Sequence, residues 1–103
     1  MARSRKDPLL LKESAAQAAA LLRALGNESR LLVLCLLSGH GEMSVGALQE
    51  QVGLSQSALS QHLARMRDEG LVTFRREAQT LYYRIDNAQA ERLIATLADI
   101  FCP

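Results

Sequence analysis

The feature that most restricts the fold of this chain is an interrupted helical pattern in residues 44–70, which read SVGALQEQVGLSQSALSQHLARMRDEG. Ser44 and Ser55 are placed as helix N-caps, Gly53 as the turn between two helices and Gly70 as the end of the second. The apolar residues that recur at helical spacing are Leu48, Val52, Leu54, Ala58, Leu59, Leu63 and Met66. A short helix, a turn with a glycine of positive φ and a longer helix form a helix-turn-helix, whose helices pack through such residues.

The segments on either side of this pattern predict three more helices and a hairpin. The expected helices span residues 9–25, 28–39 and 88–102, and the expected strands span residues 71–77 and 80–85. Asp7, Asn27 and Asn87 are placed as N-caps, and the strands are rich in Val, Thr, Phe, Tyr and Ile. The sequence therefore predicts a mainly α (α+β) fold, a winged helix-turn-helix with four helices, a hairpin and a last helix. Residues 1–103 are expected to form this single domain, with residues 1–7 flexible.

The helix predicted over residues 28–39 has apolar side chains all around it. From Leu31 to Leu37 the sequence is LLVLCLL, without a polar side chain. Such a pattern is typical of a helix that is buried on every side. Cys35 lies in this run, where a free thiol most often serves as a small packing side chain, and Cys102 is by default an incidental thiol near the chain end.

Composition restricts the class of protein and its location. The 103 residues suit one domain, and because only 4% are aromatic the core must consist of Leu, Ala, Val and Ile. No apolar run reaches the ~18 residues of a membrane span, and the N-terminus lacks the pattern of a secretory leader. We therefore expect a cytoplasmic protein without membrane contact, whose cysteines are thiols at rest. No catalytic residue pair or phosphate-binding loop stands at a useful spacing, so neither an enzyme nor a cofactor is expected.

The second helix of the helix-turn-helix has an unusual polar face. Its first two turns hold Gln56, Ser57, Ser60, Gln61 and His62, where an ordinary solvated face carries Lys and Glu. Gln bonds adenine in the major groove, and Ser contacts base edges or phosphates. This helix is therefore expected to enter the major groove of double-stranded DNA. His62 is expected either to reach DNA or to pack against the turn.

Arginines follow the polar face along the chain. The net charge is only +1, but residues 55–84 hold five arginines against three acidic residues. The arginines expected to neutralise phosphates are Arg65, Arg67, Arg75, Arg76 and Arg84. The alternative is a winged helix that binds another protein and whose polar helix face is simply solvated.

The first and last helices are apolar beyond what the core requires. Leu11, Ala15, Ala18, Leu22 and Leu25 recur at helical spacing in the first of them. A homodimer through these two helices would place two recognition helices about 34 Å apart, as an inverted-repeat operator demands.

Three segments of the chain resemble the ArsR family of bacterial dimeric winged-helix repressors. They read ALGNESRLLVLCLL, MSVGALQEQVGLSQSALSQHLARMRDEGLV and YYRI, and the resemblance covers about residues 15–102. It implies a symmetric dimer through the first and last helices and repression that an effector relieves. The two cysteines are similar in placement to those of the redox- and sulfide-responsive branch, the HlyU and BigR type of repressor. This implies that oxidants, persulfides or polysulfides cross-link Cys35 and Cys102 and thereby release DNA.

The sequence departs from the metal-sensing members of that family. Ser44 stands where they have a ligand Cys, and the last helix has acidic residues but no His. The two histidines are His40 and His62, whereas zinc requires about three or four convergent ligands. No metal is therefore expected, and a metal sensor that uses Cys35 or Cys102 with His40 or carboxylates is the alternative.

Overall fold

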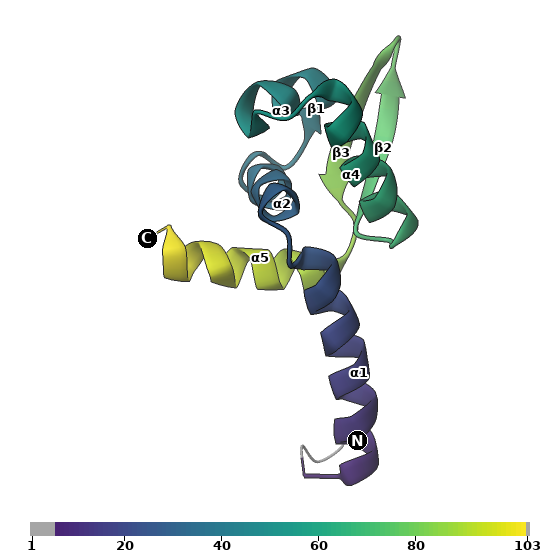
Figure 1. Ribbon diagram of the computed structural model, residues 1–103, viewed down its shortest axis with the longest axis vertical. Coiled ribbons are helices and arrows are strands. Elements are labelled where there is room, and N and C mark those ends of the chain that lie inside the picture. Colours follow the sequence, from purple (N-terminus) through teal and green to yellow (C-terminus); the bar gives the residue numbers. More distant parts are fainter. Residues whose placement is uncertain (1–5, 103) are drawn as a thin grey trace.

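The computed structural model describes residues 6–102 as five helices and three short strands (Figure 1). The elements are α1 (Pro8–Leu25), α2 (Glu28–His40), β1 (Met43–Ser44), α3 (Val45–Val52), α4 (Gln56–Asp68), β2 (Val72–Glu77), β3 (Thr80–Ile85) and α5 (Ala88–Phe101). The predicted winged helix-turn-helix is confirmed, with α3 and α4 as its two helices. Of the predicted flexible segment, residues 1–5 lie outside the described residues, while Asp7 is the N-cap of α1.

One apolar core joins the helix-turn-helix to the hairpin. Leu48 of α3 and Leu59 and Leu63 of α4 are buried together with Tyr83 of β3 and Ile94 of α5. Burial of the same residues fixes the positions of both helices and of the hairpin. The polar face of α4 therefore has a defined direction relative to the wing.

The prediction that α2 is buried on every side is wrong for the single chain. Val33, Leu34 and Leu37 are buried, but Leu32 is 40% exposed and Cys35 is half-buried. The cause is that α3, α5 and the sheet all pack on parts of α2 without surrounding it. The sequence pattern indicated that the helix is apolar, but it does not indicate how many elements pack on it.

The hairpin is part of a three-stranded antiparallel sheet with the order β1-β3-β2. The pairs Phe74 with Tyr83 and Arg75 with Tyr82 define the register of β2 and β3. Strand β1 was not predicted, because a strand of two residues has no measurable periodicity. The turn between β2 and β3 contains Ala78 with a φ of 55°, a left-handed conformation that suits the primed turns of tight hairpins.

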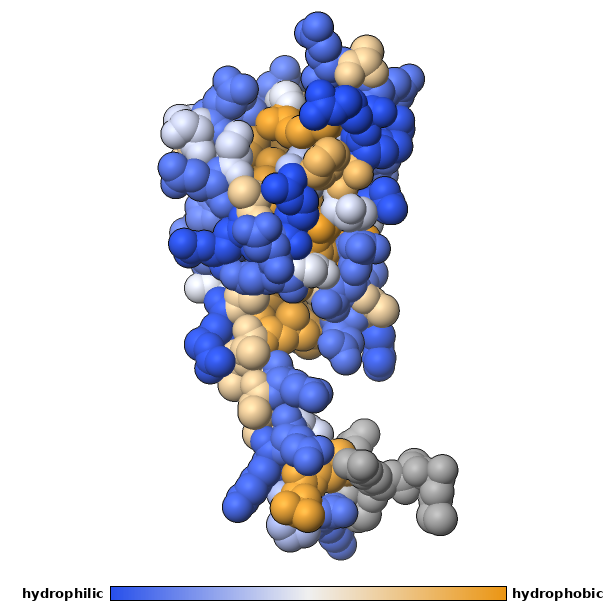
Figure 2. Space-filling view, turned by 90° about the vertical axis from the view of Figure 1, so that its right-hand side faces the viewer, coloured by the Kyte–Doolittle hydropathy of each residue, from blue (hydrophilic) through white to orange (hydrophobic). Residues whose placement is uncertain are grey.

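The helix α1 projects away from the rest of the chain (Figure 1). Leu25 is its one buried residue within the described part, while Leu11 and Leu22 are 48% and 59% exposed. Figure 2 shows hydrophobic side chains on the surface of this projecting helix. At the other end of the chain Ile100 and Phe101 of α5 are also exposed. These exposed apolar side chains leave two helices without the packing that such residues normally have.

Between residues 6 and 102, no helix is both long enough and apolar enough to cross a membrane.

Candidate nucleic-acid interface and cysteine pair

The turn between α3 and α4 has the geometry of a helix-turn-helix. Gly53 adopts a φ of 70°, and its N–H donates to the carbonyl oxygen of Gln49 over 3.4 Å. The Ser55 hydroxyl then accepts from the N–H of Ala58 over 3.1 Å and caps α4. The left-handed conformation favours glycine at this position, as the sequence indicated.

The polar side chains of α4 lie opposite its buried face. Leu59, Leu63 and Met66 are buried, whereas four of the predicted DNA-binding residues are exposed in the first turns of the helix. These four are Gln56, Ser57, Ser60 and Gln61. We call them the polar face of α4.

A polar groove separates this face from the turn of the wing. It has a volume of about 540 Å³ and is lined by Gln56 and Ser60 of α4 and by Gln79 and Thr80 of the wing. The last two were not singled out in the sequence, because Gln79 stood in a predicted turn without a recognisable motif and Thr80 began a predicted strand. The groove shows that the wing turn and the start of α4 face the same space.

Arg75 of the wing is already paired with carboxylates. Its guanidinium donates to both Glu42 oxygens over 2.9 Å and to Glu77 over 2.8 Å, and it lies 4.5 Å from the ring centre of Tyr82. The hydrogen bond from Arg75 lowers the pKa of Glu42, and the positive charge of Arg84 contributes to the same shift. Glu42 and Glu77 thus compensate the charge of Arg75 on the outer side of the sheet.

Arg76 lies on the other side of the sheet, the side that faces α4. Alternation along β2 places it with Phe74, and Arg67 of α4 lies 5.2 Å from the ring centre of Phe74. The structure gives Arg76 no hydrogen bond or ion pair with any residue between 6 and 102. Its charge is therefore available to a ligand on the α4 side.

His62 is half-buried and contacts a residue that the sequence analysis did not single out. Arg30 of α2 donates from Nε to Nδ1 of His62 over 3.4 Å and from Nη1 to the carbonyl oxygen of Ala24 over 3.0 Å. Arg30 itself is only 8% exposed. The one sign of it in the sequence is a charged residue placed directly before an all-apolar run. This partner belongs to α2 and not to the turn between α3 and α4, and a contact of His62 with DNA stays a prediction.

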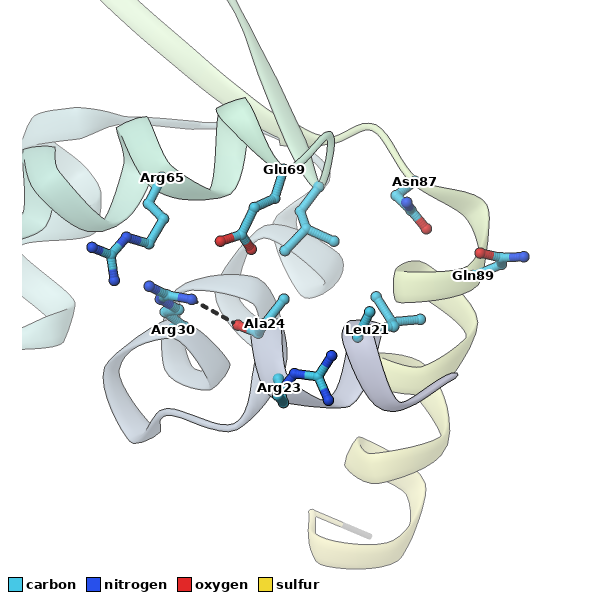
Figure 3. A pocket seen from close by; sticks show the side chains of 10 residues that line it. Leu21, Arg23, Ala24, Arg30, Arg65, Glu69, Asn87 and Gln89 are labelled. Carbon is cyan, nitrogen blue, oxygen red and sulfur yellow. Dashed lines mark hydrogen bonds between the residues drawn. The ribbon is translucent and has the colours of Figure 1, made fainter. Parts of the chain in front are cut away.

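Arg30 also borders an open pocket where α1, α2, α4 and α5 meet (Figure 3). The pocket measures about 620 Å³ and is lined by Arg23, Arg30, Arg65 and Glu69 among others. Figure 3 shows Arg65 reaching from α4 toward the Arg30 guanidinium, which is turned to the Ala24 carbonyl. Arg65 also lines a second hollow with Gln61 and His62. Arg65 therefore lies between the polar face of α4 and the pocket where α1, α2, α4 and α5 meet.

The two cysteines lie at the contact between α2 and α5. Cys35 is half-buried and Cys102 is exposed, and both are free thiols. Burial raises the pKa of Cys35, and the negative charge of the Cys102 thiolate raises it further. The second effect requires that the thiols be close in space. The two helices are also joined by Ser38, whose hydroxyl donates to Glu91 over 2.8 Å.

Within the described part of the chain, no three His, Cys, Asp or Glu side chains gather as a metal site requires.

Two packed helices with a polar exposed face, followed by a two-stranded wing on the same core, define a winged helix-turn-helix protein. The model of the family described as "Bacterial regulatory protein, arsR family" matches residues 27–73. The chain belongs to this family of bacterial regulators. As a member, it is a DNA-binding transcriptional regulator and not an enzyme.

Three similar proteins support this assignment over most of the chain. The HTH-type transcriptional regulator YgaV of Escherichia coli (strain K12) is 54% identical over 90% of this chain and 94% of its own length. The transcriptional activator HlyU of Vibrio cholerae is 45% identical over 89% of this chain and 84% of its own. The structure of reduced HlyU covers 90% of this chain and 97% of its own with a TM-score of 0.86. The transcriptional repressor BigR of Xylella fastidiosa is 38% identical, covers 98% of this chain and 99% of its own, and has a TM-score of 0.84.

Proposed function

We propose that the protein is a cytoplasmic repressor that binds an inverted-repeat operator as a homodimer. DNA is released when oxidants or reactive sulfur species, such as persulfides and polysulfides, cross-link Cys35 and Cys102. The observation that carries this proposal is the placement of Cys35 on α2 and of Cys102 at the end of α5, two helices that pack together, with the charge of Cys102 raising the pKa of Cys35. One relative is described as a repressor, and the structure of another is described as that of a reduced form, which supports a repressor with a thiol chemistry.

The thiol step proceeds by exchange at sulfur. The exposed Cys102 thiolate attacks a persulfide or polysulfide donor, forms a new S–S bond and expels the donor's thiolate or a shorter polysulfide. The Cys35 thiolate then attacks a sulfur bound to Cys102 and releases hydrosulfide, which leaves a disulfide or a longer sulfur bridge. Because the pKa of Cys35 is raised, its thiolate is scarce near neutral pH and Cys102 reacts first. The second step accelerates as the pH rises toward the pKa of Cys35.

The proposed homodimer uses the exposed apolar side chains of α1 and α5. Leu11 and Leu22 share one side of α1, since 11 residues of a helix turn through about three full circles. Ile100 and Phe101 extend the exposed apolar surface at the end of α5. A second copy of the chain would bury these side chains, which the single chain leaves in water. Cys102 stands next to Phe101, so a cross-link to α2 would act beside this interface.

The polar face of α4 is proposed to recognise base edges in the major groove. We expect the joint replacement of Gln56, Ser57, Ser60 and Gln61 by alanine to remove sequence preference but to leave salt-dependent binding, because the arginines remain. Fluorescence anisotropy measures the sequence preference and the salt-dependent binding. The probes are a duplex selected by the wild-type protein from a random library and a scrambled duplex. The unchanged circular dichroism of the variant is the control. If the wild-type protein binds no duplex even at low salt, the alternative of a protein-binding winged helix replaces this proposal.

The wing arginines are proposed to differ in their contribution to DNA affinity. Arg76→Ala is expected to weaken binding to all duplexes and to reduce the slope of log affinity against log salt by about 1, as the loss of one phosphate contact requires. Arg75→Ala is the matched control on the neighbouring position. Its effect on the slope should be smaller, because Glu42 and Glu77 already compensate its charge. A larger change of slope for Arg75→Ala than for Arg76→Ala would contradict this assignment.

A further inference from the structure

We propose that Arg30 is a positioning residue that fixes the recognition helix α4 relative to α1 through His62. This inference rests on the proposed function, in which α4 contacts DNA and α1 contacts a second copy of the chain. The guanidinium of Arg30 bonds to the end of α1 with one nitrogen and to α4 with another. One side chain of α2 thereby connects the helix of the proposed dimer interface to the helix of the proposed DNA interface.

The first contact holds the end of α1. Ala24 lies in the last turn of α1, where carbonyl groups have no partner within the helix, and its oxygen accepts from Nη1 of Arg30 over 3.0 Å. The backbone N–H of Arg30 donates in turn to the side chain of Asn27, the N-cap of α2, over 3.1 Å. Arg30 is thus bonded on both sides of the short connection between α1 and α2. The angle between these two helices is restrained at this residue.

The second contact holds α4. Nε of Arg30 donates to Nδ1 of His62 over 3.4 Å. Among residues 6–102 no other side-chain hydrogen bond joins α4 to a different element. The bond is long, but Arg30 is only 8% exposed and His62 is half-buried, so few other partners can reach the guanidinium. Loss of the acceptor leaves an N–H of a nearly buried guanidinium without its partner, which is costly in such a place.

His62 is suited to this task by its position next to Gln61. A small shift of α4 at His62 moves the polar face of the same helix, and operator recognition depends on where that face lies. Bidentate contacts to base edges depend on geometry and carry the sequence information, whereas phosphate contacts support binding to any duplex. Loss of the Arg30–His62 bond should therefore reduce specificity more than it reduces general affinity for DNA.

Three variants test the inference. Arg30→Lys keeps the charge but lacks the fork that bonds in two directions, His62→Leu removes the acceptor, and His62→Asn restores an acceptor near the place of Nδ1. The probes are a duplex selected by the wild-type protein from a random library and a scrambled duplex of equal length. Arg30→Lys and His62→Leu are each expected to lower the ratio of the two affinities about 3- to 10-fold. The double variant Arg30→Lys/His62→Leu should lower this affinity ratio no further than either single variant does. His62→Asn should retain most of the ratio.

Other results would overturn the inference. If His62→Leu lowers the ratio while Arg30→Lys does not, His62 touches DNA directly and Arg30 has no part in recognition. If both variants lower the affinity for both duplexes equally, together with the melting temperature, Arg30 has a structural role only. Should Arg30→Lys fail to fold, the comparison of His62→Leu with His62→Asn decides, since equal losses exclude the acceptor as the cause. A wild-type protein without preference for any duplex would overturn the proposed function itself, which separates the two failures.

Discussion

Treatment of the reduced protein with a polysulfide is expected to lower its operator affinity about 5- to 150-fold, which corresponds to a coupling of ~1–3 kcal/mol between the thiols and the DNA interface. A bridge between Cys35 and Cys102 ties α2 to the end of α5, next to the exposed Phe101. In the proposed dimer such a tie changes the spacing of the two recognition helices. Fluorescence anisotropy before and after treatment measures the affinity, and intact mass counts the sulfur atoms that were added.

The single variants Cys35→Ser and Cys102→Ser provide the control for this result. Each should bind the operator like the reduced wild type and should remain bound after treatment, because one thiol cannot form the bridge. Mild alkylation should modify Cys102 before Cys35, since Cys102 is exposed and burial raises the pKa of Cys35. Release of DNA from both serine variants at wild-type polysulfide concentration would place the switch elsewhere in the protein.

The substitution Leu22→Glu is expected to convert the protein into a monomer and to reduce operator affinity about 10²- to 10⁴-fold. The loss is large because a dimer binds its second half-site as an intramolecular event, and a monomer does not. Leu22 is 59% exposed in the single chain, so the fold of each chain should survive the added charge. Analytical ultracentrifugation measures the association state, and anisotropy measures the affinity.

The matched control for this substitution is Ala16→Glu on the same helix. Ala16 is exposed and lies well away from the side of Leu11 and Leu22, since five residues turn a helix by about 140° beyond a full circle. The Ala16→Glu substitution adds the same charge to α1 and should leave both the dimer and the operator affinity intact. A Leu22→Glu protein that stays dimeric and binds the operator with wild-type affinity would remove α1 from the proposed interface.

Local interactions explain how much of the fold was predictable. The five predicted N-caps, Asp7, Asn27, Ser44, Ser55 and Asn87, are all confirmed, with each side chain accepting from an N–H two or three residues further on. The positive φ of the glycine in the turn before α4 is confirmed as well. Such interactions involve neighbours in the sequence, so the residues that make them are visible in a string of letters.

The candidate site was predictable in its composition but not in its pairings. The sequence indicated which α4 side chains would be polar and exposed, because burial of Leu59 and Leu63 turns the other side of the helix outward. It gave equal weight to Arg75 and Arg76, which the structure separates by their partners. The ion pair between Arg75 and Glu42 distinguishes the two arginines, and it could not be predicted because its partners lie far apart in the sequence.

The sequence by itself therefore determined the order of the elements, their caps and the family, because these depend on local spacing and on residue type. Only the tertiary structure decided which long side chains meet across elements. It brought Arg30 to His62 and Arg75 to Glu42, and it packed α2, which holds Cys35, against α5, which ends at Cys102. It also left the side chains of Leu22 and Phe101 exposed to water, and an apolar sequence pattern does not predict such exposure. The physical reason is that packing of the core sets the distances between elements, and these distances select the partners of every charged or reactive group.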